Sequence, residues 1–298
     1  MYDAIIIGGG PAGITAGIYL ARKNLRTLLL TKDFIGQTGL TGKIENWPGE
    51  KEISGPELMS KFEEHLREQE IEIKEEEVVG VEKEDVFSVQ TKENSFSAKV
   101  VILATGRKPR PLNIPGESEF VGKGVAYCTT CDAPFFKNKR VIVVGGGNAG
   151  FESAIELSRY ASEVSLYEVA SDFSADEVLR EKAKKEGVKL KTNMELTEIK
   201  GGSFVEKVKQ KHENSEEEEV DVDGVFVEVG SLPIMDFAKD LVSTDKKGDI
   251  EIDLFTNMTK TEGLFAAGDV TKVKEKQIVI AAGEGAKAAL SAYQYIKE

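Results

Sequence analysis

Two glycine-rich loops constrain the fold of this chain more than any other feature of its sequence. The first spans residues 8–13 and the second spans residues 145–150, and each follows a short apolar run. Such a run is typical of a buried parallel strand. In both loops the glycines stand in G-x-G-x-x-G spacing, ahead of a stretch that favours a helix. The pattern predicts an α/β protein with two Rossmann-like dinucleotide-binding units.

In the first loop the spacing is carried by Gly8, Gly10 and Gly13. The first glycine permits a tight turn, the second lets the backbone approach a pyrophosphate, and the third lets the following helix pack on the sheet. Backbone N–H groups at the start of that helix, at residues 12–23, would face the phosphates. After the second strand, at residues 27–30, Thr31 stands where an acid usually binds the ribose, and the next acid is Asp33. The ribose contact of this loop therefore stays open.

In the second loop the same spacing is carried by Gly145, Gly147 and Gly150. Here the acid is present, because Glu168 follows the strand at residues 164–167. A carboxylate there can accept hydrogen bonds from both ribose hydroxyls, and it would repel a 2′-phosphate. Residues 168–175 contain no Lys or Arg to bind such a phosphate. The sequence thus predicts that NADH binds better than NADPH, although a surface glutamate at a strand end is the simpler alternative.

Cys128 and Cys131 are the two cysteines of the chain, and they form a C-x-x-C between the two loops. A zinc site needs about four ligands, and neither His65 nor His212 is close in sequence. A structural disulfide across so short a loop would remove little chain entropy. A pair of buried apolar residues is the remaining alternative. The pattern favours a redox-active dithiol, and with two dinucleotide sites it suggests an electron relay from nicotinamide through flavin to disulfide.

Composition narrows the partners and the compartment. The formal net charge of −13 argues against a nucleic acid or an anionic membrane as partner. Hydrophobic residues make up 40% of the 298 residues, enough for the cores of two domains. Met1 is followed almost at once by the first predicted strand, with no targeting segment, and no apolar run reaches the ~18 residues of a membrane span. We therefore expect a cytoplasmic protein.

In three further stretches an apolar run ends in small residues, which is the pattern of a strand whose end meets a cofactor. The apolar run at residues 100–104 ends at Thr105-Gly106, and a similar run at residues 264–267 ends at Gly268-Asp269. A third strand, at residues 225–229, ends at Gly230, on the side where open parallel sheets bind ligands. Core strands with turn glycines are the alternative for the first two.

The combination of these motifs resembles one family. Residues 128–132 ahead of the second glycine loop, with residues 44–49, 104–106 and 268–270, are similar to the low-molecular-weight thioredoxin reductases. The closest resemblance is to the flavoprotein subunit of alkyl hydroperoxide reductase, and it is carried by Glu168 and by residues 175–179, 276–280 and 282–287. The resemblance covers nearly the whole chain.

The resemblance implies two three-layer ββα domains and a homodimer. Residues 1–113 and 245–298 would bind FAD, and residues 114–244 would form an inserted NAD(P)H-binding domain that carries the C-x-x-C. The expected FAD contacts are Gly8, Gly10, Pro11, Ala12, Gly13, Gln37, Asn46, Ala104, Thr105, Gly106, Gly268, Asp269, Lys276, Gln277 and Ile278. The expected NADH contacts are Gly145, Gly147, Asn148, Ala149, Gly150, Glu168 and Gly230. Asp269 would hold the ribityl chain.

Three departures from the family pattern carry expectations of their own. The chain begins at the first glycine-loop strand, without the thioredoxin-like region of the alkyl hydroperoxide reductase flavoprotein, so we expect the dithiol to reduce a separate protein. The basic cluster that NADPH-dependent members carry after the second strand of the NAD domain is absent. Ala149 stands where a polar residue is usual, which removes one minor cofactor contact.

The mechanism implied is hydride transfer from NADH to flavin, followed by reduction of the Cys128–Cys131 disulfide. By resemblance, Cys131 faces the flavin and Cys128 attacks the partner's disulfide. Because Asp132 is adjacent to the pair, we expect it to donate and accept the proton during exchange. The inserted domain would rotate about crossings near residues 112–116 and 241–249. A thioredoxin-like protein, a glutaredoxin-like protein and a peroxidase-coupling protein are all open as acceptors. A ferredoxin-dependent enzyme and a non-catalytic flavin redox sensor are the alternative functions.

Overall fold

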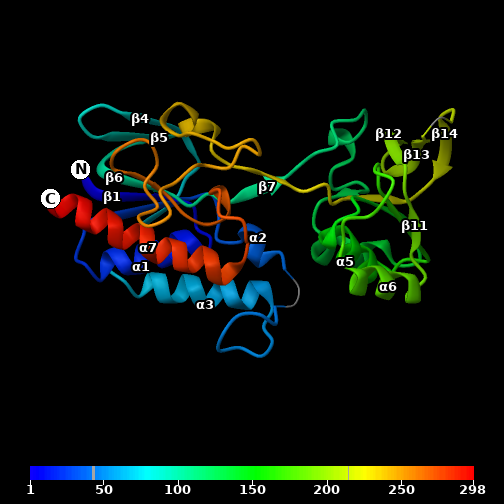
Figure 1. The fold of residues 1–298 in the computed structure, drawn as a ribbon, viewed down its shortest axis with the longest axis horizontal. Coiled ribbons are helices and arrows are strands. Elements are labelled where there is room, and N and C mark those ends of the chain that lie inside the picture. Colours follow the sequence, from blue (N-terminus) through cyan, green and yellow to red (C-terminus); the bar gives the residue numbers. More distant parts are fainter. Residues whose placement is uncertain (42–43, 214) are drawn as a thin grey trace. The chain divides into compact units, whose positions relative to one another are not determined.

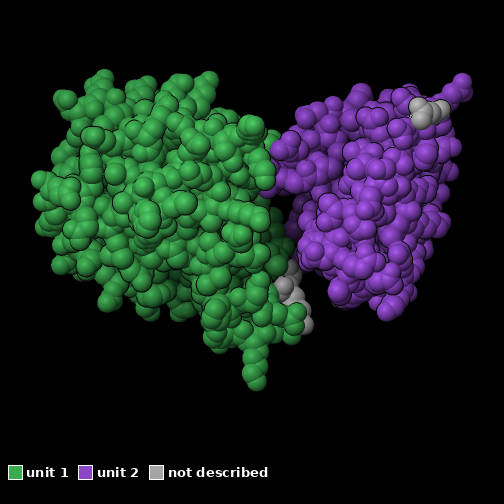
Figure 2. Space-filling model, in the orientation of Figure 1, with its two compact units in different colours: residues 1–108, 232–298 green, residues 109–231 purple. Residues whose placement is uncertain are grey.

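The computed structural model describes residues 1–41, 44–213 and 215–298. These residues form two compact units, which Figure 2 distinguishes by colour. The first unit comprises residues 1–108 and 232–298, and the second comprises residues 109–231. The second unit is therefore inserted into the first, as the resemblance implied.

The sheet of the first unit has seven strands in the part of the chain that the structure describes. Its order is β3-β2-β1-β6-β5-β4, and β17 also pairs with β6. Strands β3, β2, β1, β6 and β17 are parallel, whereas β5 and β4 extend the sheet in antiparallel pairs. The strands are β1 (Tyr2–Ile7), β2 (Thr27–Thr31), β3 (Glu72–Glu75), β4 (Val78–Lys83), β5 (Phe87–Thr91), β6 (Ser95–Leu103) and β17 (Leu264–Ala266).

Helices cover one face of this sheet, as Figure 1 shows for α1, α3 and α7. Ile6 and Ile102 point into the core under these helices, and their neighbours Ile5 and Val101 point into the core of the opposite face. This alternation follows from the two-residue repeat of a strand and explains why the strands are apolar throughout. The helices of this unit are α1 (Pro11–Ala21), α2 (Gly36–Gly39), α3 (Gly55–Arg67), α7 (Ile278–Lys297) and the 3₁₀ turns η3 (Asp236–Leu241) and η4 (Gly268–Val270).

The second unit is built in three layers. Its parallel sheet has the order β11-β10-β9-β15-β8, with helices against one face and the antiparallel sheet β12-β13-β14 against the other. Val143 of β9 faces the helices, and its neighbours Ile142 and Val144 face the antiparallel sheet. The strands are β8 (Val125–Ala126), β9 (Arg140–Val144), β10 (Glu163–Tyr167), β11 (Lys189–Lys191), β12 (Met194–Gly201), β13 (Val205–His212), β14 (Glu218–Asp221) and β15 (Gly224–Val227). The helices are η1 (Ser118–Phe120), α4 (Thr129–Asp132), η2 (Ala133–Phe136), α5 (Asn148–Leu157) and α6 (Glu177–Lys185). The predicted pair of Rossmann-like domains is confirmed.

The crossings between the units lie earlier in the chain than the sequence indicated. The chain leaves the first unit after residue 108 and re-enters it at residue 232, not near residues 114 and 244. Ala238 and Val242 are buried in the core that also holds Ile5, so residues 232–244 belong to the first unit. The charged stretch that suggested a linker is instead a surface turn, in which Asp245 accepts hydrogen bonds from the backbone N–H groups of Lys247 and Asp249.

The two crossing segments lie side by side. Strand β7 (Arg107–Pro109) and strand β16 (Ser231–Pro233) form a two-stranded sheet at the boundary between the units. Gly106 accepts a hydrogen bond from the Ile234 N–H (3.1 Å), and Gly230 accepts one from the Arg110 N–H (2.9 Å). Among the described residues, none of the helices has the length and apolar character that a membrane span requires.

Candidate active site

The first glycine loop has the geometry of a phosphate-binding turn. Gly8 lies at φ +118°, and a Cβ on it would collide with the carbonyl of Ala104. A Cβ on Gly13 would collide with the Gly8 carbonyl, so the helix can pack this closely only without side chains. Around Gly10 the space is open, and no side chain caps the N-terminus of α1 that begins there. The loop therefore leaves backbone N–H groups facing open space, as a bound pyrophosphate requires. FAD fits this site.

Residues from both ends of the chain surround this loop. A Cβ on Gly268 would lie 2.9 Å from the Cβ of Ala12, and the Gly268 N–H donates to Glu284 of α7 (2.9 Å). Asn46 donates a hydrogen bond through its side-chain amide to Gln277 (3.0 Å), 231 residues further along the chain. The structure thus places all fifteen predicted FAD residues in the first unit. Hydrogen bonds and close contacts join several of them to one another.

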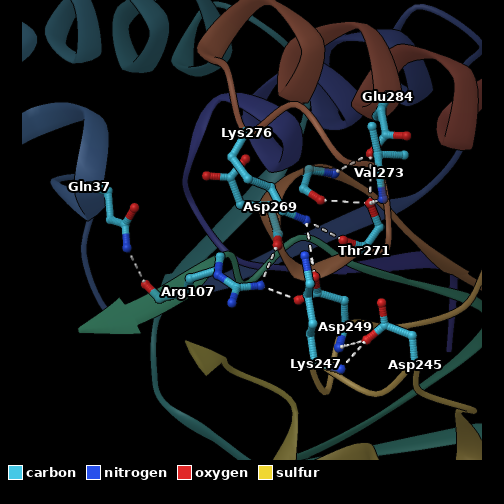
Figure 3. Close-up of polar contacts among 11 residues, drawn as sticks. Gln37, Arg107, Asp245, Lys247, Asp249, Asp269, Thr271, Val273, Lys276 and Glu284 are labelled. Carbon is cyan, nitrogen blue, oxygen red and sulfur yellow. Dashed lines mark hydrogen bonds and ion pairs between the residues drawn. The ribbon is translucent and has the colours of Figure 1, made fainter. Parts of the chain in front are cut away.

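A buried group of charges lies beside these residues (Figure 3). Arg107 forms an ion pair with Asp249, and the two side chains are only 11% and 7% exposed. Lys276 approaches the same carboxylate (3.6 Å) and donates to the carbonyl of Thr271. Burial raises the pKa of Asp269, against the opposing charges of Lys276 and Arg107. The sequence analysis missed Arg107 and Asp249, although Arg107 directly follows the Ala-Thr-Gly run.

The second glycine loop repeats the first. A Cβ on Gly145 would collide with the carbonyl of Glu228, and one on Gly150 would collide with the Gly145 carbonyl. Gly147 caps α5, and no side chain bonds to the helix start there. The space beside Gly147 is open except for a distant contact with Ser174. The fit to a second dinucleotide is therefore of the same kind.

Glu168 holds its predicted place at this loop. Its carboxylate accepts hydrogen bonds from the backbone N–H groups of Gly146 (2.7 Å) and Ala170 (2.9 Å). In the first unit Thr31 occupies the matching place, since a Cβ on Gly9 would lie 2.7 Å from its hydroxyl oxygen. Asp33 is directed elsewhere and accepts from the N–H groups of Ile35 and Gly36. The two sites therefore share a position but differ in charge.

Asn148 is tied to the loop that follows Glu168. Its side-chain amide donates to the Asp176 carboxylate (2.9 Å), and its carbonyl oxygen accepts from the Asp176 backbone N–H (2.8 Å). Arg180 holds the same loop, because its guanidinium bonds to Asp172 (3.1 Å) and to the carbonyl of Ala175 (2.8 Å). Sequence reasoning missed this arginine, which lies beyond the segment that it considered.

Cys128 and Cys131 form a disulfide at the start of α4. Cys128 caps this short helix, and its sulfur accepts a hydrogen bond from the Cys131 N–H (3.3 Å). Asp132 closes the helix, and partial burial raises the pKa of its carboxyl. The structure therefore brings the three predicted catalytic residues into a single turn.

Two glutamates that the sequence analysis missed contact residues near this turn. Glu117 accepts hydrogen bonds from the Tyr127 hydroxyl (2.7 Å) and from the N–H groups of Leu112 (2.8 Å) and Asn113 (2.6 Å). Burial and this hydrogen bond raise the pKa of Tyr127, the residue before Cys128.

Glu228 is half-buried and directly follows β15. It accepts a hydrogen bond from the Ser153 hydroxyl of α5 (2.7 Å). Burial raises its pKa, while Ser153 and the nearby Thr129 favour the charged form. The buried Thr129 hydroxyl makes no hydrogen bond of ordinary geometry among the described residues. Thr130 donates to Glu156 of α5 (3.2 Å), so the turn is held against that helix.

Comparison with known proteins decides the family. The family model for pyridine nucleotide-disulphide oxidoreductases matches residues 2–285. The chain belongs to this family. It is 43% identical over 304 aligned residues to the F subunit of alkyl hydroperoxide reductase from Staphylococcus aureus, covering 99% of this chain and 59% of that protein. The chain therefore spans little more than half the length of this relative.

Two solved structures match over almost their full length. Thioredoxin reductase from Lactococcus lactis has a TM-score of 0.92 and 38% identity, and the match covers 100% of this chain and 99% of that one. Thioredoxin reductase from T. acidophilum has a TM-score of 0.89 and 37% identity, with 98% of each chain covered. These matches confirm the resemblance found in the sequence. Membership of the family implies a flavin and a pyridine nucleotide as cofactors.

Proposed function

We propose that the chain transfers electrons from NADH, through FAD, to the Cys128–Cys131 disulfide and then to a separate protein disulfide. The observation that carries this proposal is the disulfide turn itself, which lies in the same inserted unit as a complete dinucleotide loop with an acid at its ribose position. When bound, FAD accepts hydride from nicotinamide and supplies the two electrons that open the disulfide.

The first unit would hold FAD. Backbone N–H groups at the start of α1 would bind the pyrophosphate, where Gly10 leaves the approach open. Asp269 would hold the ribityl chain, with Asn46, Gln277 and Gln37 placing polar groups around it. Gly8, Pro11, Ala12, Gly13, Ala104, Thr105, Gly106, Gly268, Lys276 and Ile278 complete the proposed set.

The second unit would hold NADH in preference to NADPH. The Glu168 carboxylate accepts a hydrogen bond from the Gly146 N–H, next to the position that the adenosine ribose takes in this type of loop. A 2′-phosphate would meet that negative charge at close range. Arg180, the first arginine after Glu168 in the chain, is engaged with Asp172 and with carbonyls of its own loop. Gly145, Gly147, Asn148, Ala149, Gly150 and Gly230 would supply the remaining contacts.

The dithiol chemistry would use the three residues of the redox turn. Reduction of the disulfide takes up two electrons and two protons and gives two thiols. The Cys128 thiolate then attacks the acceptor disulfide to form a mixed disulfide, and Cys131 displaces the reduced acceptor. Asp132, with its raised pKa, would give a proton to one sulfur on reduction and take it back on exchange.

The acceptor would be a thioredoxin-like or a glutaredoxin-like protein. The two similar structures are named thioredoxin reductases, which supports the first class. We further propose that the enzyme is a homodimer. We also propose that it is cytoplasmic, because thiols in the cytoplasm stay reduced enough for turnover.

The test combines flavin binding with an acceptor screen. Purified protein should be yellow or should bind added FAD, and anaerobic addition of NADH should bleach the flavin. Thioredoxin-like and glutaredoxin-like proteins are then offered with NADH and NADPH in parallel, and Cys128→Ser serves as the control. A flavin that stays oxidised with both nucleotides contradicts the proposal that NADH is the electron donor, and it favours a ferredoxin-dependent enzyme. Reduction of the flavin without reduction of any acceptor favours a redox sensor.

A further inference from the structure

Arg107 is a buried arginine that neither the glycine loops nor the redox turn explains. It lies on β7, at the point where the chain leaves the first unit, and its side chain is 11% exposed. A guanidinium stays charged in proteins, so its burial requires close partners. Its partners come from segments that are far apart in the sequence.

Three chain segments meet at this residue (Figure 3). The guanidinium pairs with Asp249, 142 residues away, and donates to the backbone carbonyl of Asp269 (3.4 Å), 162 residues away. The Arg107 carbonyl accepts a hydrogen bond from the Gln37 side-chain amide (3.0 Å). Gln37 and Asp269 are both proposed FAD contacts. Arg107 therefore bonds to one proposed contact that precedes it in the chain and to one that follows it.

Asp249 extends the connection to a third proposed contact. Its second carboxylate oxygen lies 3.6 Å from the Lys276 ammonium. Lys276 directly precedes Gln277 and the start of α7. The backbone beyond Asp249 also follows the Asp269 turn, because the Ile250 N–H donates to the Val270 carbonyl and the Ile250 carbonyl accepts from Lys272 (2.9 Å each). Asp249 thus links Arg107 to both segments that the C-terminal part of the chain brings to the first glycine loop.

We propose that Arg107, acting through Asp249, is a positioning residue for FAD, which assembles the segments of Gln37, Asp269 and Lys276 into one binding edge. This inference rests on the proposed function. A buried ion pair contributes little net stability compared with an apolar pair of similar volume, so stability alone does not account for it. What the pair supplies is a fixed geometry between remote segments.

The experiment separates flavin affinity from stability. Apoprotein of wild type, Arg107→Met and Asp249→Leu is titrated with FAD, and unfolding of each apoprotein is followed by denaturant. Each single variant removes one charge of the buried pair and keeps the other, so both should lose stability. The double variant Arg107→Met/Asp249→Leu removes both charges, so its apoprotein should recover stability towards wild type. Its dissociation constant for FAD should nevertheless stay at least ~10-fold above wild type, a ratio that corresponds to about 1.4 kcal/mol.

Two further variants keep the test decisive. Arg22→Met removes an exposed arginine of the same unit and should change neither quantity. Arg107→Lys retains the charge but not the planar fork, and it should fold and still bind FAD more weakly than wild type. If Arg107→Met fails to fold, the double variant and Arg107→Lys provide the comparison.

The inference is overturned if the double variant, or Arg107→Lys, binds FAD as tightly as wild type. Failure of the proposed function has a different signature, because wild-type protein would then bind no FAD at all. A variant that loses stability and flavin affinity in parallel, with both restored together in the double variant, also contradicts the inference, since that is the behaviour of a purely structural pair.

Discussion

The Tyr127 hydroxyl donates a hydrogen bond to Glu117 (2.7 Å), and this bond joins the residue before Cys128 to the segment by which the chain enters the inserted unit. The same carboxylate accepts from the N–H groups of Leu112 and Asn113, just after the first crossing. The position of the redox turn is therefore tied to the crossing segment by one buried carboxylate.

Replacing Tyr127 with Phe should remove this hydrogen bond while the aromatic ring keeps its packing. The lost hydrogen bond to a buried carboxylate should lower the free energy of unfolding by about 1.5–3 kcal/mol. We expect slower reduction of the protein acceptor and an unchanged rate of flavin reduction by NADH, because the flavin step does not use Cys128. Stopped-flow absorbance measures both rates, and Tyr160→Phe is the matched control. Equal acceptor rates in the two variants would show that the bond does not position the turn.

Replacing Glu168 with Gln should reduce the preference for NADH. The neutral amide accepts weaker hydrogen bonds from the ribose and no longer repels a 2′-phosphate. We expect the KM for NADH to rise about tenfold, which corresponds to about 1.4 kcal/mol, and the KM for NADPH to fall. Steady-state kinetics with both nucleotides measures the ratio, and Glu181→Gln on the surface of α6 is the control. A ratio that does not move would mean that Glu168 is only a strand-end residue.

Replacing Asp132 with Asn should impair dithiol exchange in a pH-dependent manner. Burial raises the pKa of Asp132, so its protonated fraction persists above the ordinary value of 3.8 and is lost as pH rises through the folded pKa. We expect acceptor reduction in the variant to slow by about 10²-fold or more and to lose the pH dependence that this group causes. Thiol alkylation and acceptor reduction against pH provide the measurement. A variant with the pH profile of wild type would remove Asp132 from the proton transfers.

Replacing Glu228 with Gln should change how stability depends on pH. Burial raises the folded pKa of Glu228 above the ordinary value of 4.5, so the native state binds more protons than the unfolded state between these two values. Wild-type stability should therefore fall as pH rises from 4.5 through the folded pKa, and the Gln variant should lack that part of the fall. Denaturant unfolding across this range measures the difference between the two proteins. A difference that is constant with pH would mean that Glu228 titrates normally.

The parts of the fold that depend on local pattern could be predicted from the sequence. The glycine loops, their strands and the C-x-x-C follow from spacing, because a tight turn or a close helix approach tolerates only glycine at Gly8 or Gly13. Glu168 could be placed because it follows a strand at a fixed distance from its loop.

The long-range polar contacts could not be predicted in this way. Arg107 meets Asp249 only because the chain returns to the first unit after the inserted one, and no local signal in the sequence encodes that meeting. The second crossing was placed too late, because the charges at residues 244–249 resemble a linker, whereas burial of Ala238 and Val242 decides where the unit begins. Glu117 and Glu228 were missed because an isolated glutamate is usually a surface residue.

The pairing of β7 with β16 gives the inserted unit an entrance and an exit on neighbouring strands, about 4.8 Å apart. A host whose cut ends lie this close can be rejoined by a short turn, so excising residues 109–231 need not unravel the first unit. We therefore expect that an inserted unit of different nucleotide preference could be grafted between the same two strands without interrupting the sheet of the first unit.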